Sequence, residues 1–320
     1  MQVTHYLQWL QYIKSQTQTA ASVVWVNMDE TAVLFHFAKA RGNICHRGLQ
    51  KAGKYRQWAS MSMRRGHCTL AAVICDNVDV QKEMPQFLIP NMKGCKKVWL
   101  GCPHLSEPTS ALRVITDGNG WMTVEHMLLL LKEVSVHIRS KIPHAVIVFT
   151  SDCHASHLAP KTVRKMRQLH CIPLFIPSKL THMLQPLDVA VFAPFKRCPE
   201  ATLTAKRLES EERNQTLQKW MHAALPCIQQ FFSSVDCSRV FARVGQHRDF
   251  AQLKDSIRHA ALPTWARCCE ALSEDALTQY LGCKRPVLRK WLFAWPSKPP
   301  VHVAAAGAKP LKRLHSKTAL

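Results

Sequence analysis

The sequence predicts a mixed α/β domain over roughly its first 200 residues, followed by a helical region. Continuous apolar runs stop at an acid at 22–30 and at 145–152, as in strands that are buried on both faces. Segments of helical periodicity alternate with such runs between 123 and 200. Beyond 200 the strand pattern disappears while helical periodicity continues, which indicates a separate helical end.

The N-terminal half supplies an opening helix and most of the expected strands. Apolar residues at helical spacing predict an amphipathic helix over 5–18: Tyr6, Leu7, Leu10 and Ile13. SVVWVNMDE (22–30) is expected to be a buried strand, and TAVLFHF (31–37), which follows at once, its hairpin partner. Apolar runs predict three further strands, at 68–76, 86–92 and 98–100.

The next segments alternate between helix and strand. Thr123 is a typical N-cap residue for a long helix over 123–140. Next come a strand at 145–152, a basic amphipathic helix over 158–170, a strand at 171–177 and a short helix over 189–197. We therefore expect four parts: an N-terminal helix (1–20), an α/β domain (21–200), a helical C-terminal region (201–295) and a basic, disordered tail (296–320), since the tail has no acid and is rich in Pro and Ala.

Composition points to a polyanionic partner. The chain has 43 Lys and Arg against 21 Asp and Glu, a formal net charge of +22. A folded chain with this excess of positive charge is expected to bind nucleic acid. The richest apolar run is interrupted by Lys132 and Glu133 and is too short to cross a bilayer, so we expect no membrane association. The 13 cysteines form no C-x-x-C pair, which favours a reduced intracellular compartment.

Three acids occupy similar positions after predicted strands. Asp29 and Asp152 each lie at or just past the end of a buried strand, and Asp188 opens a helix after a third strand. If these strands are neighbours, the carboxylates meet at one edge of the sheet and repel one another unless a divalent cation lies between them. Mg²⁺ and Mn²⁺ prefer such oxygen ligands. A single Asp after a strand is more often a turn or cap residue, so spacing alone leaves both interpretations open.

The residues around these acids form three recognisable strings. NMDET (27–31), SDCHASH (151–157) and THMLQPLDVAVFAPFK (181–196) resemble, in order, the motifs of the DDE superfamily endonuclease domain of pogo/Tigger/jerky-type transposases. GWMTVEHM (120–127) is similar to the helix that precedes the second acid in that family. The resemblance covers about 20–200 and QPLD with its flanks is its most specific part.

The resemblance implies an RNase H-like fold: a mixed sheet flanked by helices. It also implies a DDD triad of Asp29, Asp152 and Asp188, two Mg²⁺ or Mn²⁺ ions, and metal-dependent cleavage and joining of DNA strands. Supporting roles fall to Ser156 and His157, which shape a turn or contact substrate, and to Gln185 and Pro186, which fix the approach to Asp188. Synapsis of two DNA ends in this family implies a homo-oligomer.

Basic side chains are candidates for contacts with DNA phosphates. Lys196 lies about two helical turns beyond Asp188. The predicted helix over 158–170 carries three more candidates, and the basic segment 39–66, expected to be a loop, carries two: Lys161, Arg164, Lys165, Arg64 and Arg65. The segment 274–292 matches either a helix-turn-helix or a plain helical pair. PLKRLHSK near the C-terminus is a small basic cluster of the kind that directs proteins to the nucleus, where we expect this protein to act.

Other titratable residues compete less well for the site. Glu200 is an alternative third acid, and His154 lies close enough to Asp152 to reach a metal. Three further acids have turn-like contexts that favour cap or loop roles: Asp76, Asp79 and Asp117. The Cys/His pairs lack the spacing of a zinc site.

The chain departs from the family pattern at its N-terminus. Full-length members carry helix-turn-helix modules there, whereas only about 20 residues precede the first expected strand, so the chain is expected to be a fragment or a remnant that lost end recognition. The predicted function is a transposase-derived DNA endonuclease and strand transferase. The alternatives are a catalytically inert, domesticated DNA-binding remnant and an RNase H-like nuclease that acts on RNA–DNA hybrids or junctions.

Overall fold

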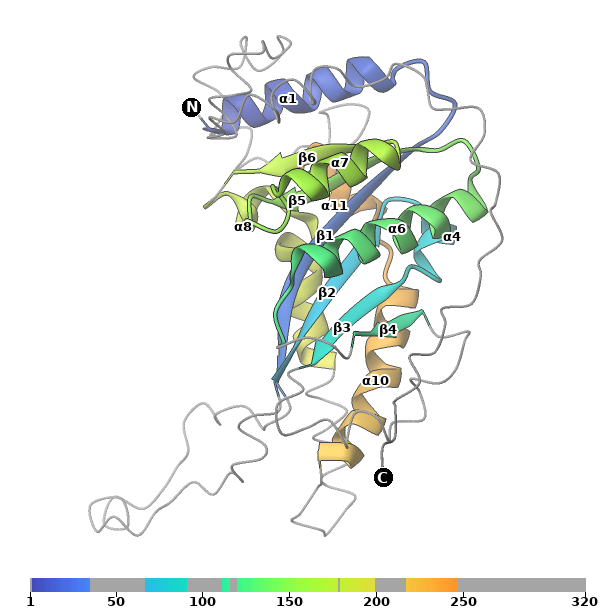
Figure 1. Cartoon of the computed structure of the whole chain (residues 1–320), viewed down its shortest axis with the longest axis vertical. Coiled ribbons are helices and arrows are strands. Elements are labelled where there is room, and N and C mark those ends of the chain that lie inside the picture. Colours follow the sequence, from blue (N-terminus) through green and yellow to red (C-terminus); the bar gives the residue numbers. More distant parts are fainter. Residues whose placement is uncertain are drawn as a thin grey trace, which may run out of the picture.

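The computed structural model describes residues 2–34, 67–90, 111–115, 120–177, 179–198 and 217–246. Its centre is a six-stranded sheet in the order β4-β3-β2-β1-β5-β6 (Figure 1). The strands are β1 (Val23–Leu34), β2 (His67–Cys75), β3 (Gln86–Pro90), β4 (Leu112–Val114), β5 (Val146–Asp152) and β6 (Cys171–Ile176).

Strand directions identify the fold. β2 is antiparallel to both β1 and β3, whereas β5 is parallel to β1 and β6 is parallel to β5. A first strand with an antiparallel meander on one side and two parallel strands on the other is the RNase H-like arrangement. The expected fold is therefore confirmed, with β4 added parallel to β3 at one edge.

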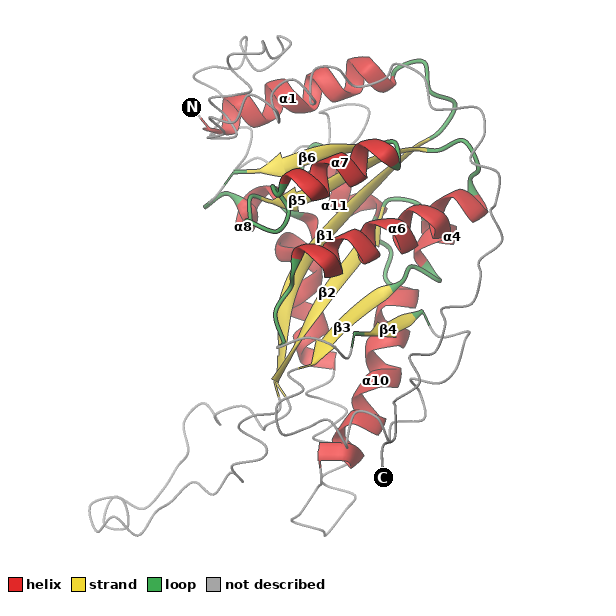
Figure 2. Ribbon diagram, viewed as in Figure 1, coloured by secondary structure: helices red, strands yellow, loops and turns green. Residues whose placement is uncertain are grey.

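Helices cover both faces of the sheet (Figure 2). α6 (Val124–Lys141) and α7 (Pro160–Gln168) lie on one face, and α10 (Leu217–Ser234) and α11 (Ser238–Arg243) lie on the other. α1 (Gln2–Thr17) packs along β6, where the Trp9 indole donates to the carbonyl of Pro173 at 3.3 Å. Other helical segments are short: α4 (Val78–Gln81), α8 (Thr181–Leu184) and the π-helix η2 (Leu187–Val191), which continues as helix through residues 192–198. No helix in these described ranges has the length and apolar character needed to cross a membrane.

Most expected elements are confirmed close to their predicted bounds. The opening helix, the strands at 68–76, 86–92, 145–152 and 171–177 and the helices over 123–140 and 158–170 all appear. Thr123 caps α6 as predicted: its hydroxyl accepts the N–H of His126 at 3.2 Å. The three-residue strand β4 is an addition to the predicted elements.

The predicted hairpin between 22–30 and 31–37 is wrong. β1 continues without a turn to Leu34, and its antiparallel partner is β2, in a register that runs from Val26 opposite Cys75 to Leu34 opposite His67. No Gly or Pro stands between 27 and 34 to form a tight turn, so the chain remains extended past the acids. Asp29 consequently lies within a strand rather than at its end.

Several predicted features lie outside the described residues. These are the strand at 98–100, the basic segment 39–66 with Arg64 and Arg65, Asp117, Glu200, the segment 274–292 and the tail 296–320. They stay predictions.

Candidate active site

Asp29 lies just beyond the parallel pairing of β1 with β5, which ends at Asn27 opposite Thr150. Its Oδ1 accepts the N–H of Glu30 at 2.8 Å. Burial first, and then the negative charges of Asp188, Glu30 and Asp152, together raise the pKa of Asp29 to about 8, although the hydrogen bond from the N–H of Glu30 lowers it. The charges of both other predicted acids therefore act on Asp29.

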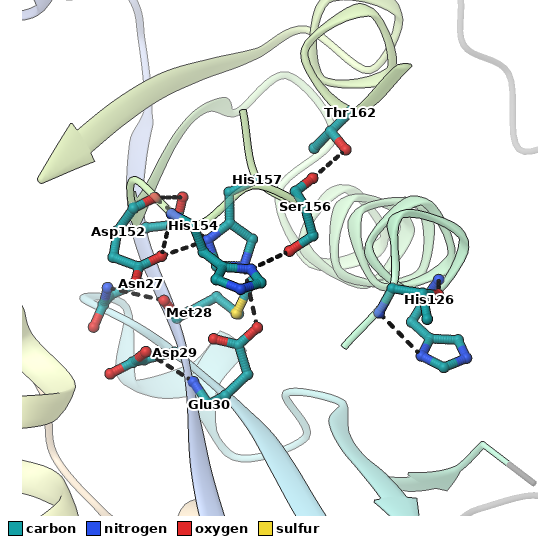
Figure 3. Close-up of polar contacts among 12 residues, drawn as sticks. Asn27, Met28, Asp29, Glu30, His126, Asp152, His154, Ser156, His157 and Thr162 are labelled. Atoms are coloured by element: carbon teal, nitrogen blue, oxygen red, sulfur yellow. Dashed lines mark hydrogen bonds and ion pairs between the residues drawn. The ribbon is translucent and has the colours of Figure 1, made fainter. Parts of the chain in front are cut away.

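Asp152 is the last residue of β5 and is held by a buried histidine. His157 Nδ1 lies 2.6 Å from Asp152 Oδ1, and His157 Nε2 lies 3.1 Å from Oε1 of Glu30 (Figure 3). Burial alone would lower the pKa of His157, but hydrogen bonds to Asp152 and Glu30 and their charges raise it well above its ordinary value. The imidazole is therefore a cation at neutral pH, clamped between two carboxylates.

The same contact acts on Asp152. Burial opposes ionisation, yet the hydrogen bond and charge of His157 and the backbone N–H of His154, 3.0 Å from Oδ1, lower the pKa of Asp152. Asp152 is thus ionised at neutral pH, in contrast to the raised pKa of Asp29.

The turn after Asp152 is closed by its own side chains. The Ser156 hydroxyl lies 2.8 Å from His154 Nδ1, and the Ser156 carbonyl accepts the Thr162 hydroxyl at 2.7 Å (Figure 3). These bonds join the turn to the first turn of α7, and Ser156 contributes to both of them. His154 is exposed and contributes its backbone N–H to Asp152.

The approach to Asp188 runs from α8 through Gln185 and Pro186 into η2. Gln185 is fully buried, and its Nε2 donates to the carbonyl of Met28 at 3.4 Å. Pro186 has helical dihedral angles (φ −50°, ψ −43°) and starts η2, whose first turn carries Asp188. Asp188 itself is exposed, on the second residue of this helix.

Comparison with known proteins identifies the family. The family model of the DDE superfamily endonuclease matches residues 68–242 of the sequence, more than half of the chain. The chain belongs to the DDE superfamily endonucleases. The matched residues include Asp152 and Asp188 and extend to α11, whereas Asp29 lies upstream of them.

A solved structure is also similar, the Mos1 transposase paired-end complex with left transposon end. The similarity has a TM-score of 0.39 and 12% identity, and it covers 78% of this chain and 63% of that chain. No curated protein matches the chain.

The donor set of this endonuclease domain suits a divalent cation. Asp29, Asp152 and Asp188 offer hard carboxylate oxygens, and the pKa of Asp29 is raised partly by the charge of the other acids, which a cation would offset. Within the described ranges, no three His, Cys, Asp or Glu side chains are arranged as a finished metal site. The Oδ1 of Asp152 is instead bonded to His157 and to the N–H of His154.

A basic pocket lies between α6 and α7 of the endonuclease domain. It has a volume of about 430 Å³ and is lined by Leu128, Leu129, Lys132, Lys161, Arg164, Lys165 and Gln168. Three of the predicted DNA-binding residues therefore share one concave surface, and none of the lining side chains is acidic. Lys196 is exposed elsewhere, with its ammonium group 5.8 Å from the ring centroid of Phe192.

Sequence reasoning missed the role of Glu30. Alternation along β1 places the side chains of Asp29 and Glu30 on opposite sides of the strand (Figure 3), so Glu30 faces His157 while Asp29 does not. The pairing of Glu30 with His157 joins positions 127 residues apart. The strings NMDET and SDCHASH contain both residues, but no local pattern links one string to the other.

Proposed function

We propose that the chain is the catalytic domain of a transposase-derived DNA endonuclease and strand transferase. Asp29, Asp152 and Asp188 would hold two Mg²⁺ or Mn²⁺ ions. The observation that supports this proposal is that Asp29 and Asp152 each follow the last parallel pair of β1 and β5 by two residues, with the charges of both Asp152 and Asp188 raising the pKa of Asp29. When bound, the cations supply Lewis-acid activation of the attacking hydroxyl and stabilise the charge on the leaving oxygen.

The protein's own residues prepare the site for this chemistry. His157 holds Asp152 ionised and in one orientation, as residues that bond to ligating carboxylates do in other metal enzymes. The side chains therefore contribute fixed negative charge and orientation.

Basic residues would hold the DNA. Lys161, Arg164 and Lys165 lie on α7, and this helix begins directly after the turn that follows Asp152. A phosphate backbone in the α6–α7 pocket would thus lead toward the acids. Lys196, Arg64 and Arg65 are further candidates for phosphate contacts, as predicted from the sequence. The protein would work in the nucleus, as a homo-oligomer when two DNA ends are joined.

The second candidate is an inert DNA-binding remnant. The basic pocket favours it as much as it favours an enzyme, because it would bind phosphates whether or not the acids are active. The two functions differ in what the acids do.

Plasmid nicking separates them. Supercoiled plasmid is incubated with Mn²⁺ and with wild type, Asp152→Ala, Asp188→Ala or the control Asp79→Ala. Asp79 is an exposed acid on α4 that forms an ion pair with Lys82, the C-cap residue of that helix. Nicking by wild type and Asp79→Ala alone supports the enzyme, with DNA affinity unchanged or slightly higher in the two triad variants because a negative charge is removed. Equal nicking by all four proteins, or none by any with DNA binding retained, contradicts it.

A further inference from the structure

A buried asparagine connects the backbone beside each of the three acids. Asn27 is fully buried on β1, two residues before Asp29. Its Nδ2 donates to the carbonyl of Thr150 at 3.1 Å, two residues before Asp152. Its Oδ1 accepts the N–H of Leu187 at 3.0 Å, one residue before Asp188. One side-chain amide therefore bonds to both of the segments that bring the other two acids to β1.

The chemistry of these bonds requires an amide. The N–H of Leu187 is at the start of η2 and lacks a partner inside that helix, so it needs an acceptor, whereas the Thr150 carbonyl takes a donor from the same side chain. An asparagine offers both in one rigid plane, an aspartate offers acceptors, and a leucine offers neither. Both bonds form together at one placement of η2 relative to β1 and β5.

The geometry of β1 and β5 links the position of Asn27 to the positions of Asp29 and Asp152. Asn27 opposite Thr150 is the last parallel pair of β1 and β5, and Asp29 and Asp152 each follow by two residues, one full strand repeat. Figure 3 shows Asn27 and Asp29 on the same side of β1, with Glu30 on the other. Gln185 adds a second tie, because its Nε2 donates to the carbonyl of Met28 between Asn27 and Asp29.

We propose that Asn27 is a positioning residue that sets the location of the Asp188 helix relative to Asp29 and Asp152. Cation binding by the three acids, which rests on the proposed function, depends on this placement. The hydrogen bonds of the Asn27 side chain go to backbone atoms of Met28, Thr150 and Leu187. Asn27 therefore acts through the backbone beside the acids.

A matched control separates positioning from ordinary core stability. Gln86 is also a buried amide, with 1% exposure, and it bonds only to backbone among the described residues. Its Oε1 accepts the N–H of Val73 at 2.9 Å, and its Nε2 donates to the carbonyls of Val73 and Met84. Gln86→Leu therefore removes comparable bonds from the same sheet at a place that none of the acids shares.

The experiment compares wild type, Asn27→Leu, Asn27→Ala and Gln86→Leu. Mn²⁺ affinity is measured by competition with a fluorescent chelator, and hydrogen exchange is measured by mass spectrometry on the peptide that spans 181–192. In either Asn27 variant we expect Mn²⁺ to bind about 10–100-fold more weakly and the peptide to exchange faster. Gln86→Leu should match wild type in both measurements although its melting temperature falls. The alanine variant serves if the leucine variant does not fold.

The outcomes distinguish the two proposals. Mn²⁺ affinity and peptide exchange in the Asn27 variants equal to those of Gln86→Leu would overturn the role of Asn27 while leaving the proposed function in place. Failure of wild type to bind Mn²⁺ or to nick plasmid would overturn the proposed function. In that case the exchange measurement still decides whether Asn27 holds the Asp188 helix, because it needs neither metal nor DNA.

Discussion

The Nδ1 atom of His157 lies 2.6 Å from Oδ1 of Asp152. The other ring nitrogen lies 3.1 Å from Glu30, so a fully buried imidazolium joins the end of β5 to β1. The positive charge of the buried imidazolium offsets the negative charges of the two carboxylates, and removing the imidazolium leaves two partly buried acids without this partner cation. This clamp orders the candidate active site.

Replacing His157 should damage both stability and cleavage. We expect His157→Ala to lower the free energy of unfolding by about 2 kcal/mol, because two charge-assisted hydrogen bonds are removed. Plasmid nicking should fall by about 10–100-fold, because Asp152 loses the group that orients it. Urea unfolding and nicking rates in Mn²⁺ measure the two effects. His154→Ala, which removes an exposed ring from the same turn, is the control, and equal losses in the two variants would contradict the clamp.

Asp76 should make stability depend on pH. Burial raises the pKa of Asp76 to about 6, although its Oδ1 accepts the N–H of Trp25 at 2.9 Å. The unfolded chain releases this proton near pH 4, so wild type loses stability as the pH rises from about 4 to 6. The side chain of Asp76→Asn does not titrate. The free energy of unfolding of this variant should therefore rise relative to that of wild type between about pH 4 and 6, by no more than about 3 kcal/mol, and the difference should stay constant above about pH 6.

Thermal or urea unfolding between pH 4 and 8 measures this difference. Asp236 provides a control of opposite sign, because hydrogen bonds from the Ser238 hydroxyl and N–H lower its pKa. An acid with a lowered pKa adds stability that is lost as the pH falls, so Asp236→Asn should lose stability relative to wild type as the pH rises. The same trend in both variants would count against the assigned effect of burial on Asp76.

The basic pocket should determine DNA affinity without affecting the chemical step. We expect Lys161→Ala and Lys165→Ala each to weaken DNA binding and to reduce the slope of log affinity against log salt by about 0.9 for each phosphate that the protein no longer neutralises. The nicking rate at saturating DNA should stay close to that of wild type. Fluorescence anisotropy at several salt concentrations measures the slope. Lys82→Ala, which removes an exposed lysine paired with Asp79 on α4, should leave the slope unchanged, and an equal effect there would indicate a diffuse charge effect instead.

Helix α10 should behave as part of the endonuclease domain rather than as an appendage. The Phe232 ring on α10 lies 5.2 Å from the ring of Phe195, on the helix that continues from Asp188, and the Phe232 carbonyl accepts Gln81 Nε2 at 2.9 Å. Phe232→Ala should lower the free energy of unfolding by about 3–5 kcal/mol. Urea unfolding measures this loss, and Val136→Ala, which shortens an exposed apolar residue on α6, should change it little. A small loss at Phe232 would show that α10 folds independently.

The sequence by itself determined the elements and the acids. Continuous apolar runs predict strands buried on both faces, and helical spacing predicts α1, α6 and α7, because both periodicities are local properties of the chain. The strings around Asp29, Asp152 and Asp188 predicted the family and its RNase H-like fold. These patterns need no knowledge of which strands are neighbours.

Tertiary structure alone decided how the acids are held. Glu30 and His157 are 127 positions apart, and Asn27 reaches Thr150 and Leu187 across 123 and 160 positions. Such contacts depend on strand order and register, which fix the side of the sheet that each residue faces. The expected hairpin at 31–37 was wrong for the same reason: an apolar run after Asp29 is compatible with a turn or with an unbroken strand, and pairing with β2 selected the strand.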